Sequence, residues 1–177
     1  MDFHQNYFEL FGLPVSFGLD GGSLTERYRD LQKVLHPDRF ANASDQERRL
    51  SLQQAAQVNS AYDTLRDPLS RARYLLRLRG LEYNDESSTI SDLEFLEEQM
   101  GLREQLADIR HDKNPTVLLD DFMAKLDARS REYIEGLSGL FASPEDVDME
   151  KAKNLVQRMQ FIRRLQAEGE ALEEALM

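Results

Sequence analysis

The sequence predicts an all-α protein, and three observations support that fold class. Cap residues mark six helix starts, apolar residues recur at helical spacing between them, and no segment alternates apolar and polar residues over the length of a strand. The chain has 177 residues, of which 41% are hydrophobic and 31% are charged. These proportions suit a soluble, helix-rich protein that buries a core.

The expected helices follow one another in order along the chain. A short first helix is expected at Tyr7–Phe11, where the sequence reads YFELF. Six later starts are marked by a serine three residues before a glutamate, which is the capping-box spacing, or by a cap residue before proline. These starts are Ser23, Ser44, Asp67, Ser91, Asn114 and Ser143. Pro37 should end the second helix near Leu35, because proline disfavours the helical conformation in the residue before it.

Charge divides the chain into two parts. Residues 1–80 carry 11 basic and 10 acidic side chains, whereas residues 81–177 carry 11 basic and 23 acidic ones. The segment from Arg79 to Thr89 is polar, turn-rich and without helical periodicity. We therefore expect a domain over residues 1–79, a linker over 80–89 and an acidic three-helix bundle over 90–177. The acidic part should repel nucleic acids and anionic membranes, and it suits a protein partner with a basic face.

The composition also excludes several kinds of chemistry. The chain has no cysteine, so thiolate metal sites, disulfides and cysteine nucleophiles are excluded. The N-terminus lacks the basic region and the apolar run of a secretory signal, and no stretch approaches about 18 consecutive apolar residues. We expect a cytoplasmic protein that spans no membrane and needs no cofactor.

The loop VLHPDRF at the end of the second helix carries the candidate site of the N-terminal domain. His36, Pro37 and Asp38 could be helix punctuation, half of a metal site, an acid–base pair or a docking element. A metal site would need companions, but His4 and His111 have no ligand spacing to His36. An acid–base pair would need a nucleophile, an oxyanion motif or a phosphate-binding loop, and none accompanies it. We therefore expect no enzyme activity.

The helices on either side of this loop are amphipathic. At about 100° per residue, one face of the second helix carries Leu24, Tyr28, Leu31 and Leu35, and one face of the third carries Ala55, Val58, Ala61, Tyr62 and Leu65. Two such helices, joined by a short loop with a proline bend, should form an antiparallel hairpin. The short first helix can then pack across the hairpin.

The N-terminal domain resembles the J-domain family. NYFELFGLP is similar to the opening of a J-domain, YRDLQKVLHPDRF to its second helix and signature loop, and VNSAYDTLRDPLSRARY to its third helix and the segment after that helix. The resemblance implies a co-chaperone that stimulates ATP hydrolysis by a 70-kilodalton heat-shock chaperone. It places chaperone binding at His36, Pro37 and Asp38, with electrostatic contacts at Arg29 and Lys33. Asp30 and Val34 interrupt the basic run that many J-domains carry, so this contact should be weaker or more selective.

Two apolar stripes on the helix over residues 93–109 distinguish the C-terminal domain. Phe95, Leu102, Leu106 and Ile109 lie within about 60° and should face the core, as should Leu118, Phe122, Leu126 and Tyr133 of the middle helix. Leu155, Met159, Ile162 and Leu172 share the core face of the last helix, whereas Phe161 is predicted to face solvent. Leu93, Leu96 and Met100 lie on a separate arc beside Glu97 and Glu104. The excess apolar residues predict a binding surface; the alternatives are packing against the first domain and apolar residues scattered on the surface.

The two domains together resemble the HscB family of co-chaperones of iron–sulfur cluster assembly. A J-domain, a short linker and an acidic bundle that opens with FLEEQMGLREQL carry the resemblance. It implies an HscA-like heat-shock chaperone as the partner of the J-domain and an IscU-like scaffold as the partner of the bundle. The scaffold-binding residues would be Leu93, Leu96, Met100, Glu104 and Phe161. Glu97 and Gly101 depart from the expected pattern at the edge of this site. Two alternatives stay open: a J-domain co-chaperone with a different client, and a helical scaffold without a chaperone role.

Overall fold

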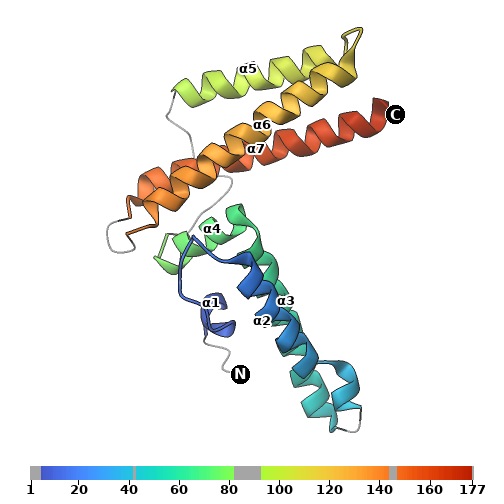
Figure 1. Ribbon diagram of the computed structural model, residues 1–177, viewed down its shortest axis with the longest axis vertical. Helices are drawn as coiled ribbons and strands as arrows, with labels where there is room; N and C mark the ends of the chain where they lie inside the picture. The colour runs from blue at the N-terminus through green and yellow to red at the C-terminus, as the bar shows by residue number, and fades with distance from the viewer. Residues whose placement is uncertain (1–4, 42, 82–92, 144–146, 177) are drawn as a thin grey trace. The chain divides into compact units, whose positions relative to one another are not determined.

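The computed structural model describes residues 5–41, 43–81, 93–143 and 147–176, and these ranges contain helices and loops but no strand. The predicted all-α class is confirmed. The elements are α1 (Tyr7–Leu10), α2 (Gly21–Val34), the 3₁₀ helix η1 (Pro37–Phe40), α3 (Asp45–Arg66), α4 (Pro68–Leu78), α5 (Leu93–Ile109), α6 (Pro115–Leu140) and α7 (Met149–Leu176) (Figure 1). They form two compact units, Met1–Arg79 and Gly80–Met177. Within the described ranges, no helix combines the length and the apolar character that crossing a bilayer requires.

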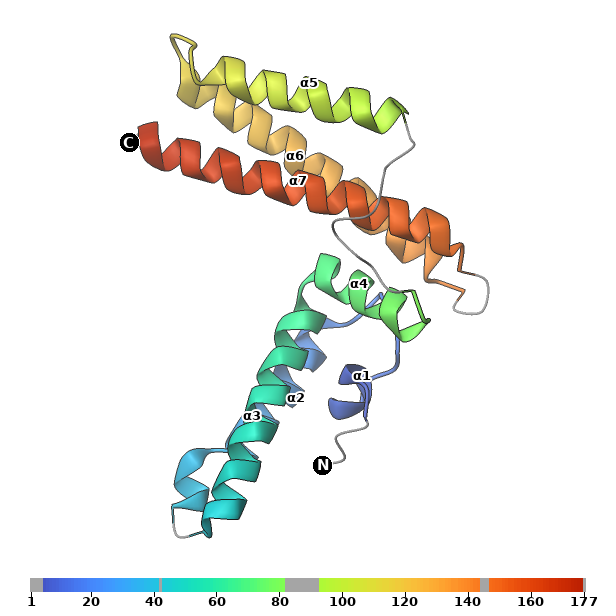
Figure 2. The same cartoon turned by 180° about the vertical axis from the view of Figure 1, so that it is seen from behind.

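In the first unit, α2 and α3 lie side by side as the predicted antiparallel hairpin, with η1 between them in the chain (Figures 1 and 2). Leu24 of α2 and Val58 and Leu65 of α3 are fully buried. Tyr28 and Tyr62 add a stacked aromatic pair across the hairpin, with ring centroids 4.0 Å apart. The hairpin therefore has an apolar seam between Leu24 and Leu35 of the α2 segment and Val58 and Leu65 of α3, as the helical spacing predicted.

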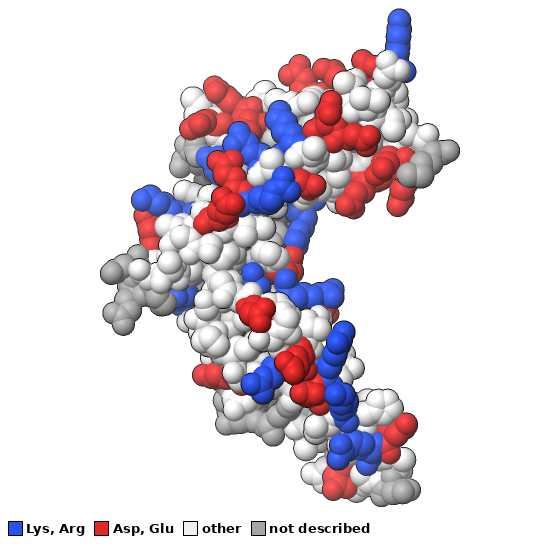
Figure 3. Space-filling model, in the orientation of Figure 1, with Lys and Arg blue, Asp and Glu red and all other residues white. Residues whose placement is uncertain are grey.

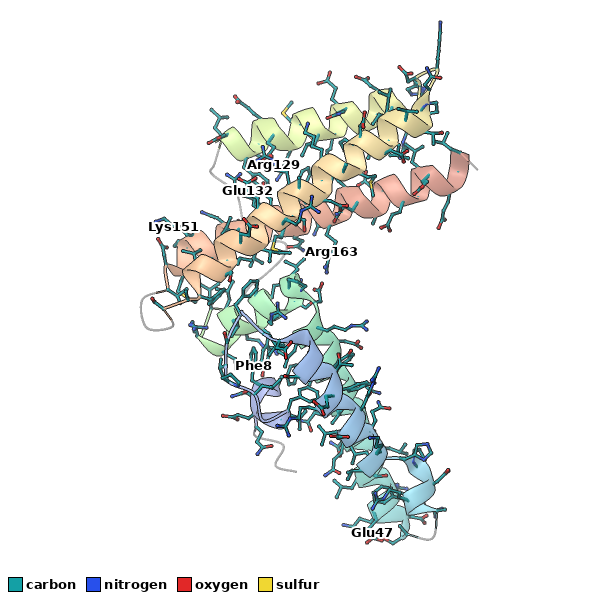
Figure 4. The ribbon with its side chains drawn as sticks, viewed as in Figure 1. Phe8, Glu47, Arg129, Glu132, Lys151 and Arg163 are labelled. Carbon is teal, nitrogen blue, oxygen red and sulfur yellow. The ribbon has the colours of Figure 1, made fainter. Side chains whose placement is uncertain are left out.

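The short helix α1 packs against α3 and is tied to α4. The Tyr7 amide donates a hydrogen bond to the Tyr74 hydroxyl at 2.8 Å, and the two rings stack with centroids 4.5 Å apart. Phe8, labelled in Figure 4, is completely buried. These contacts fix the N-terminal segment on the hairpin.

Cap hydrogen bonds explain where the helices of the first unit begin. Ser44 forms the predicted capping box, because its hydroxyl accepts from the Glu47 amide at 3.3 Å while the Glu47 carboxylate accepts from the Ser44 amide at 2.9 Å. Asp67 likewise caps α4 before Pro68. The predicted start at Ser23 is wrong, since α2 begins at Gly21 and its cap is Asp20. The Asp20 carboxylate accepts the amides of residues 22 and 23 and the Ser23 hydroxyl, and these hydrogen bonds lower the pKa of Asp20.

The helix starts of the second unit agree less well with the sequence signals. Helix α6 begins at Pro115 as predicted, although the Asn114 side chain makes no cap hydrogen bond. The predicted start at Ser143 is wrong, because α7 begins only at Met149. Its first turn is capped by Asp148, whose carboxylate accepts from the Lys151 amide at 3.1 Å. The predicted start at Ser91 lies outside the described residues.

In the second unit, α6 and α7 share the largest interface, and α5 packs on both through smaller ones (Figures 1 and 2). The predicted core residues that are buried are Phe95, Leu102, Leu106, Ile109, Phe122, Leu126, Tyr133, Met159 and Ile162. The prediction that Leu118 faces the core is wrong: Leu118 is exposed, and Leu119, one residue later, is buried instead. Leu155 and Leu172 are only half-buried, because the buried stripe of α7 runs through Val156 and Leu165 instead.

Gly101 lies in the middle of α5 on its exposed side, where a methyl group would meet no other atom within 4 Å. We expect Gly101→Ala to raise the free energy of unfolding by about 1 kcal/mol, because glycine is a poor helix former. Thermal denaturation followed by circular dichroism measures the change. Gly169→Ala is the contrasting variant, since a methyl group at this buried position of α7 would overlap the Met123 sulfur. An equal gain from both variants would contradict the explanation.

Candidate functional site

The loop of His36, Pro37 and Asp38 has a defined conformation. Helix α2 ends at Val34, and the predicted end near Leu35 is confirmed. His36 precedes the proline in an extended conformation, with φ −58° and ψ 132°, and its Nδ1 accepts a hydrogen bond from the Asp38 amide at 3.3 Å. A neutral His36 ring therefore carries its proton on Nε2. The side chains of His36 and Asp38 are 60% and 91% exposed, so a rigid turn presents both to solvent.

A hollow of about 180 Å³ lies beside this loop, between the end of α2 and α3. Its wall includes Leu35, Pro37 and Val58, together with the polar side chains of Gln32 and Asn59. Gln32 donates to the Asn59 side-chain oxygen at 2.8 Å and to the Tyr28 hydroxyl at 2.7 Å. Sequence reasoning missed this pair. Gln32 lies one helical turn before His36, and this nearness to the loop was the signal in the sequence that could have indicated its role.

The predicted electrostatic contacts lie on the exposed side of α2. Arg29 and Lys33 are one turn apart, and both line a shallow depression along the helix. Lys33 pairs with Asp30 at 3.1 Å, so part of its charge is already neutralised within the helix. Figure 3 shows basic side chains gathered along one edge of the α2–α3 hairpin. This edge offers a positive surface next to the loop.

The outward side of α5 presents the other candidate surface. Leu93, Leu96 and Met100 are 69%, 41% and 73% exposed, and Glu104 is also exposed. Their exposure was predicted from the helical spacing and is confirmed. Large apolar side chains on a solvent-facing helix are typical of a binding surface. We call Leu93, Leu96, Met100 and Glu104 the outer face of α5.

The predicted exposure of Phe161 is wrong. Phe161 is only 7% exposed, and its ring meets the buried Phe95 ring edge to face at 5.8 Å. The Arg103 guanidinium lies 5.8 Å from the centre of the Phe161 ring. Helix α7 packs against both α5 and α6, so its buried arc is wider than the single stripe that the spacing argument assumed. Phe161 supports α5 from within the bundle.

Truncation of Phe161 should therefore act on the fold. We expect Phe161→Ala to lower the free energy of unfolding by about 3 kcal/mol, because it leaves a cavity beside Phe95. Urea denaturation followed by circular dichroism measures the loss. Leu93→Ala, which removes an exposed side chain, should change stability by less than about 0.5 kcal/mol. Equal stabilities for Phe161→Ala and the unchanged chain would contradict the buried position.

Sequence reasoning also missed Glu98 of α5. Its side chain is only 20% exposed and pairs with Arg129 of α6 and Arg158 of α7. The available signal was its position, because Glu98 lies on the apolar stripe between Phe95 and Leu102. A carboxylate on a buried stripe needs a partner.

Comparisons with known proteins decide the family. The chain is 40% identical over 172 residues to the co-chaperone protein HscB homolog of Shewanella woodyi, covering 97% of this chain and 99% of that protein. It is 46% identical over 173 residues to the corresponding Vibrio cholerae protein, covering 98% and 99%. The chain belongs to the HscB co-chaperone family. Residues 91–175 of this HscB-family chain also match the family described as the HSCB C-terminal oligomerisation domain.

Solved structures of HscB proteins have the same fold. The chaperone HscB from Vibrio cholerae matches with a TM-score of 0.86 at 44% identity, covering 98% of this chain and all of that one. The human co-chaperone protein HscB matches with a TM-score of 0.89 at 31% identity, covering 98% and 84%. The Jac1 co-chaperone from Saccharomyces cerevisiae shares the fold at 21% identity, with a TM-score of 0.74 and 95% and 96% covered. The predicted HscB resemblance and the predicted co-chaperone function are confirmed.

Proposed function

We propose that this HscB-family co-chaperone is an adaptor between two proteins. The loop of His36, Pro37 and Asp38, with Arg29 and Lys33 on α2, stimulates the ATPase of an HscA-like, 70-kilodalton heat-shock chaperone. The outer face of α5 binds an IscU-like iron–sulfur scaffold and brings it to that chaperone. The J-domain comprises residues 1–79 and the scaffold-binding bundle comprises residues 90–177.

The conformation of the loop is the observation that carries the proposal. The hydrogen bond from the Asp38 amide to His36 and the fixed φ of Pro37 hold the turn before any partner arrives. Little conformational entropy is then lost on docking. The positive charge of Arg29 and Lys33 would steer a chaperone with an acidic surface toward the same side of the hairpin. These features support a docking element rather than plain helix punctuation.

The outer face of α5 supports the second half of the proposal. Its three apolar side chains give a partner something to bury, and Glu104 adds a negative charge for a basic rim. Phe161 was expected to belong to this surface, and we now assign it a supporting role beneath α5. The adaptor would work in the cytoplasm by binding, with no catalytic group or cofactor of its own.

One pair of assays tests the proposal with the full chain. The ATPase rate of a purified HscA-like chaperone is measured with and without the protein, and an IscU-like scaffold is titrated against the protein by calorimetry. We expect stimulation of ATP hydrolysis and a one-to-one complex with the scaffold. Absence of stimulation would contradict the role of the loop. Stimulation without scaffold binding would favour a J-domain co-chaperone with another client.

A further inference from the structure

Helix α5 has two apolar stripes in its N-terminal half, where apolar burial alone does not select which one faces the bundle; only the inner stripe continues, through Leu106 and Ile109. The inner stripe includes Phe95 and Leu102, and the outer one includes Leu93, Leu96 and Met100. Members of each stripe recur at intervals of three, four or seven residues, which places them on one side of a helix. Hydrophobic burial is non-directional, and α5 has the smaller interfaces of the unit. A rotation of α5 about its axis would replace one apolar stripe by the other.

Glu98 breaks this near-equivalence because it lies on the inner stripe and is charged. Its Oε1 pairs with Arg129 Nε at 3.2 Å, and its Oε2 pairs with Arg158 Nη1 at 3.5 Å. The Tyr133 hydroxyl lies 3.5 Å from the same carboxylate. Figure 4 shows Arg129 between α5 and α6. One carboxylate of α5 is thus held by both neighbouring helices, and it has these partners only when the inner stripe faces them.

Next to the ion pairs lies a row of cation–π and aromatic contacts whose members come alternately from α7 and α5. The Arg158 guanidinium lies 4.6 Å from the centre of the Phe95 ring, and Phe95 meets Phe161 edge to face. The Arg103 guanidinium of α5 lies 5.8 Å from the centre of the Phe161 ring. The four side chains, in order Arg158, Phe95, Phe161 and Arg103, therefore come from α7, α5, α7 and α5. Glu98 holds Arg158, and Arg158 lies on the side chain that anchors the start of α5.

We infer that Glu98 is a positioning residue for scaffold binding: its pairing with Arg129 and Arg158 keeps the outer face of α5 turned outward. This inference rests on the proposed function of that face. A polar residue at a core position is known to select one packing arrangement, often without adding stability. Glu98 does not touch the scaffold. It acts by raising the fraction of molecules whose α5 is oriented for binding.

Glu98→Met in the full chain tests orientation when binding is compared among samples that are fully folded. Methionine removes the carboxylate that Arg129 and Arg158 share, so the free energy of unfolding should fall while the chain stays folded at the assay temperature. If the binding-competent orientation falls to about one tenth of the population, the dissociation constant for an IscU-like scaffold rises about tenfold. Calorimetric titration measures this rise. Hydrogen exchange of the α5 amides in the free protein should become faster, while exchange in the α6–α7 core stays unchanged.

Glu132→Met is the matched control. Glu132 pairs with Arg129 at 2.9 Å, but its side chain is 63% exposed on α6. Its loss should leave scaffold binding and α5 exchange unchanged. Glu98→Gln is the second variant, since it keeps the shape of the side chain and removes only the charge. It should also weaken scaffold binding while the helical content stays the same.

The outcomes separate this inference from the proposed function. If the unchanged chain binds the scaffold and both Glu98 variants bind it equally well, the positioning role is wrong and the proposed function stands. If both variants bind less only to the extent that they unfold, Glu98 is a stability residue and the inference is likewise overturned. If the unchanged chain does not bind the scaffold, the proposed function fails and the inference fails with it.

Discussion

His36→Gln is expected to remove most of the stimulation of the chaperone ATPase. The side chain of His36 has two functions in the loop, because Nδ1 accepts from the Asp38 amide while Nε2 remains exposed as a donor. Glutamine is flexible and cannot hold both atoms in these positions. Loss of a central contact residue typically costs about 2 kcal/mol of binding energy, which corresponds to about a thirtyfold weaker interaction. The measurement is single-turnover ATP hydrolysis by an HscA-like chaperone at increasing concentrations of each variant.

His111→Gln provides the matched control for this experiment. His111 is exposed and lies in the second unit, after the end of α5. The same chemical change at this position should leave ATPase stimulation unaltered. The circular dichroism spectrum of each variant verifies that the helices are intact. Full stimulation by His36→Gln would refute the assignment of the loop as the chaperone-binding element.

The double substitution Leu96→Ala with Met100→Ala is expected to weaken scaffold binding about a hundredfold. Each truncation removes an exposed apolar side chain whose burial by a partner contributes about 1.5 kcal/mol, and the two lie one turn apart on α5. Stability should change little, since both side chains are already in contact with solvent. Calorimetric titration of an IscU-like scaffold measures the loss.

The control is the pair Leu50→Ala with Leu52→Ala on α3. These leucines are 43% and 61% exposed, so the pair removes a comparable area of apolar surface from the first unit. Scaffold affinity should be unchanged in this variant. An equal loss in both double variants would indicate a nonspecific effect of surface hydrophobicity. Undiminished binding by the α5 variant would place the client elsewhere on the protein.

Local signals predicted the elements of this fold well because caps and prolines act within a few residues. Pro37 ended α2 at the predicted place, and Ser44 and Asp67 began their helices as predicted. The errors arose where two local signals competed. Asp20 outranked Ser23 as a cap because its carboxylate reaches three donors, and Asp148 took the place predicted for Ser143.

Contacts between helices were harder to predict because helical spacing gives a face but not the number of neighbours. The buried residues of α5 lie within one narrow arc, and their burial followed from the spacing. The buried residues of α7 span a wider arc, because α7 packs on α6 and also meets α5 through Phe161, so the burial of Phe161 did not follow. The pairing of Glu98 with Arg158 joins residues 60 positions apart in the sequence, which no local pattern records. The candidate surface could therefore be predicted, but the residues that hold it in place could not.

The separation of the two sides of α5 has an evolutionary consequence. The residues that attach the helix to the bundle, such as Phe95 and Leu102, are distinct from those that it offers to a partner, such as Leu96 and Met100. Substitutions on a solvent-facing side usually change stability by less than about 0.5 kcal/mol. The outward side chains can therefore diverge between species, in step with a changing partner, while the fold is retained. Glu97, where the family resemblance led us to expect an apolar residue, is exposed and lies on this outward side.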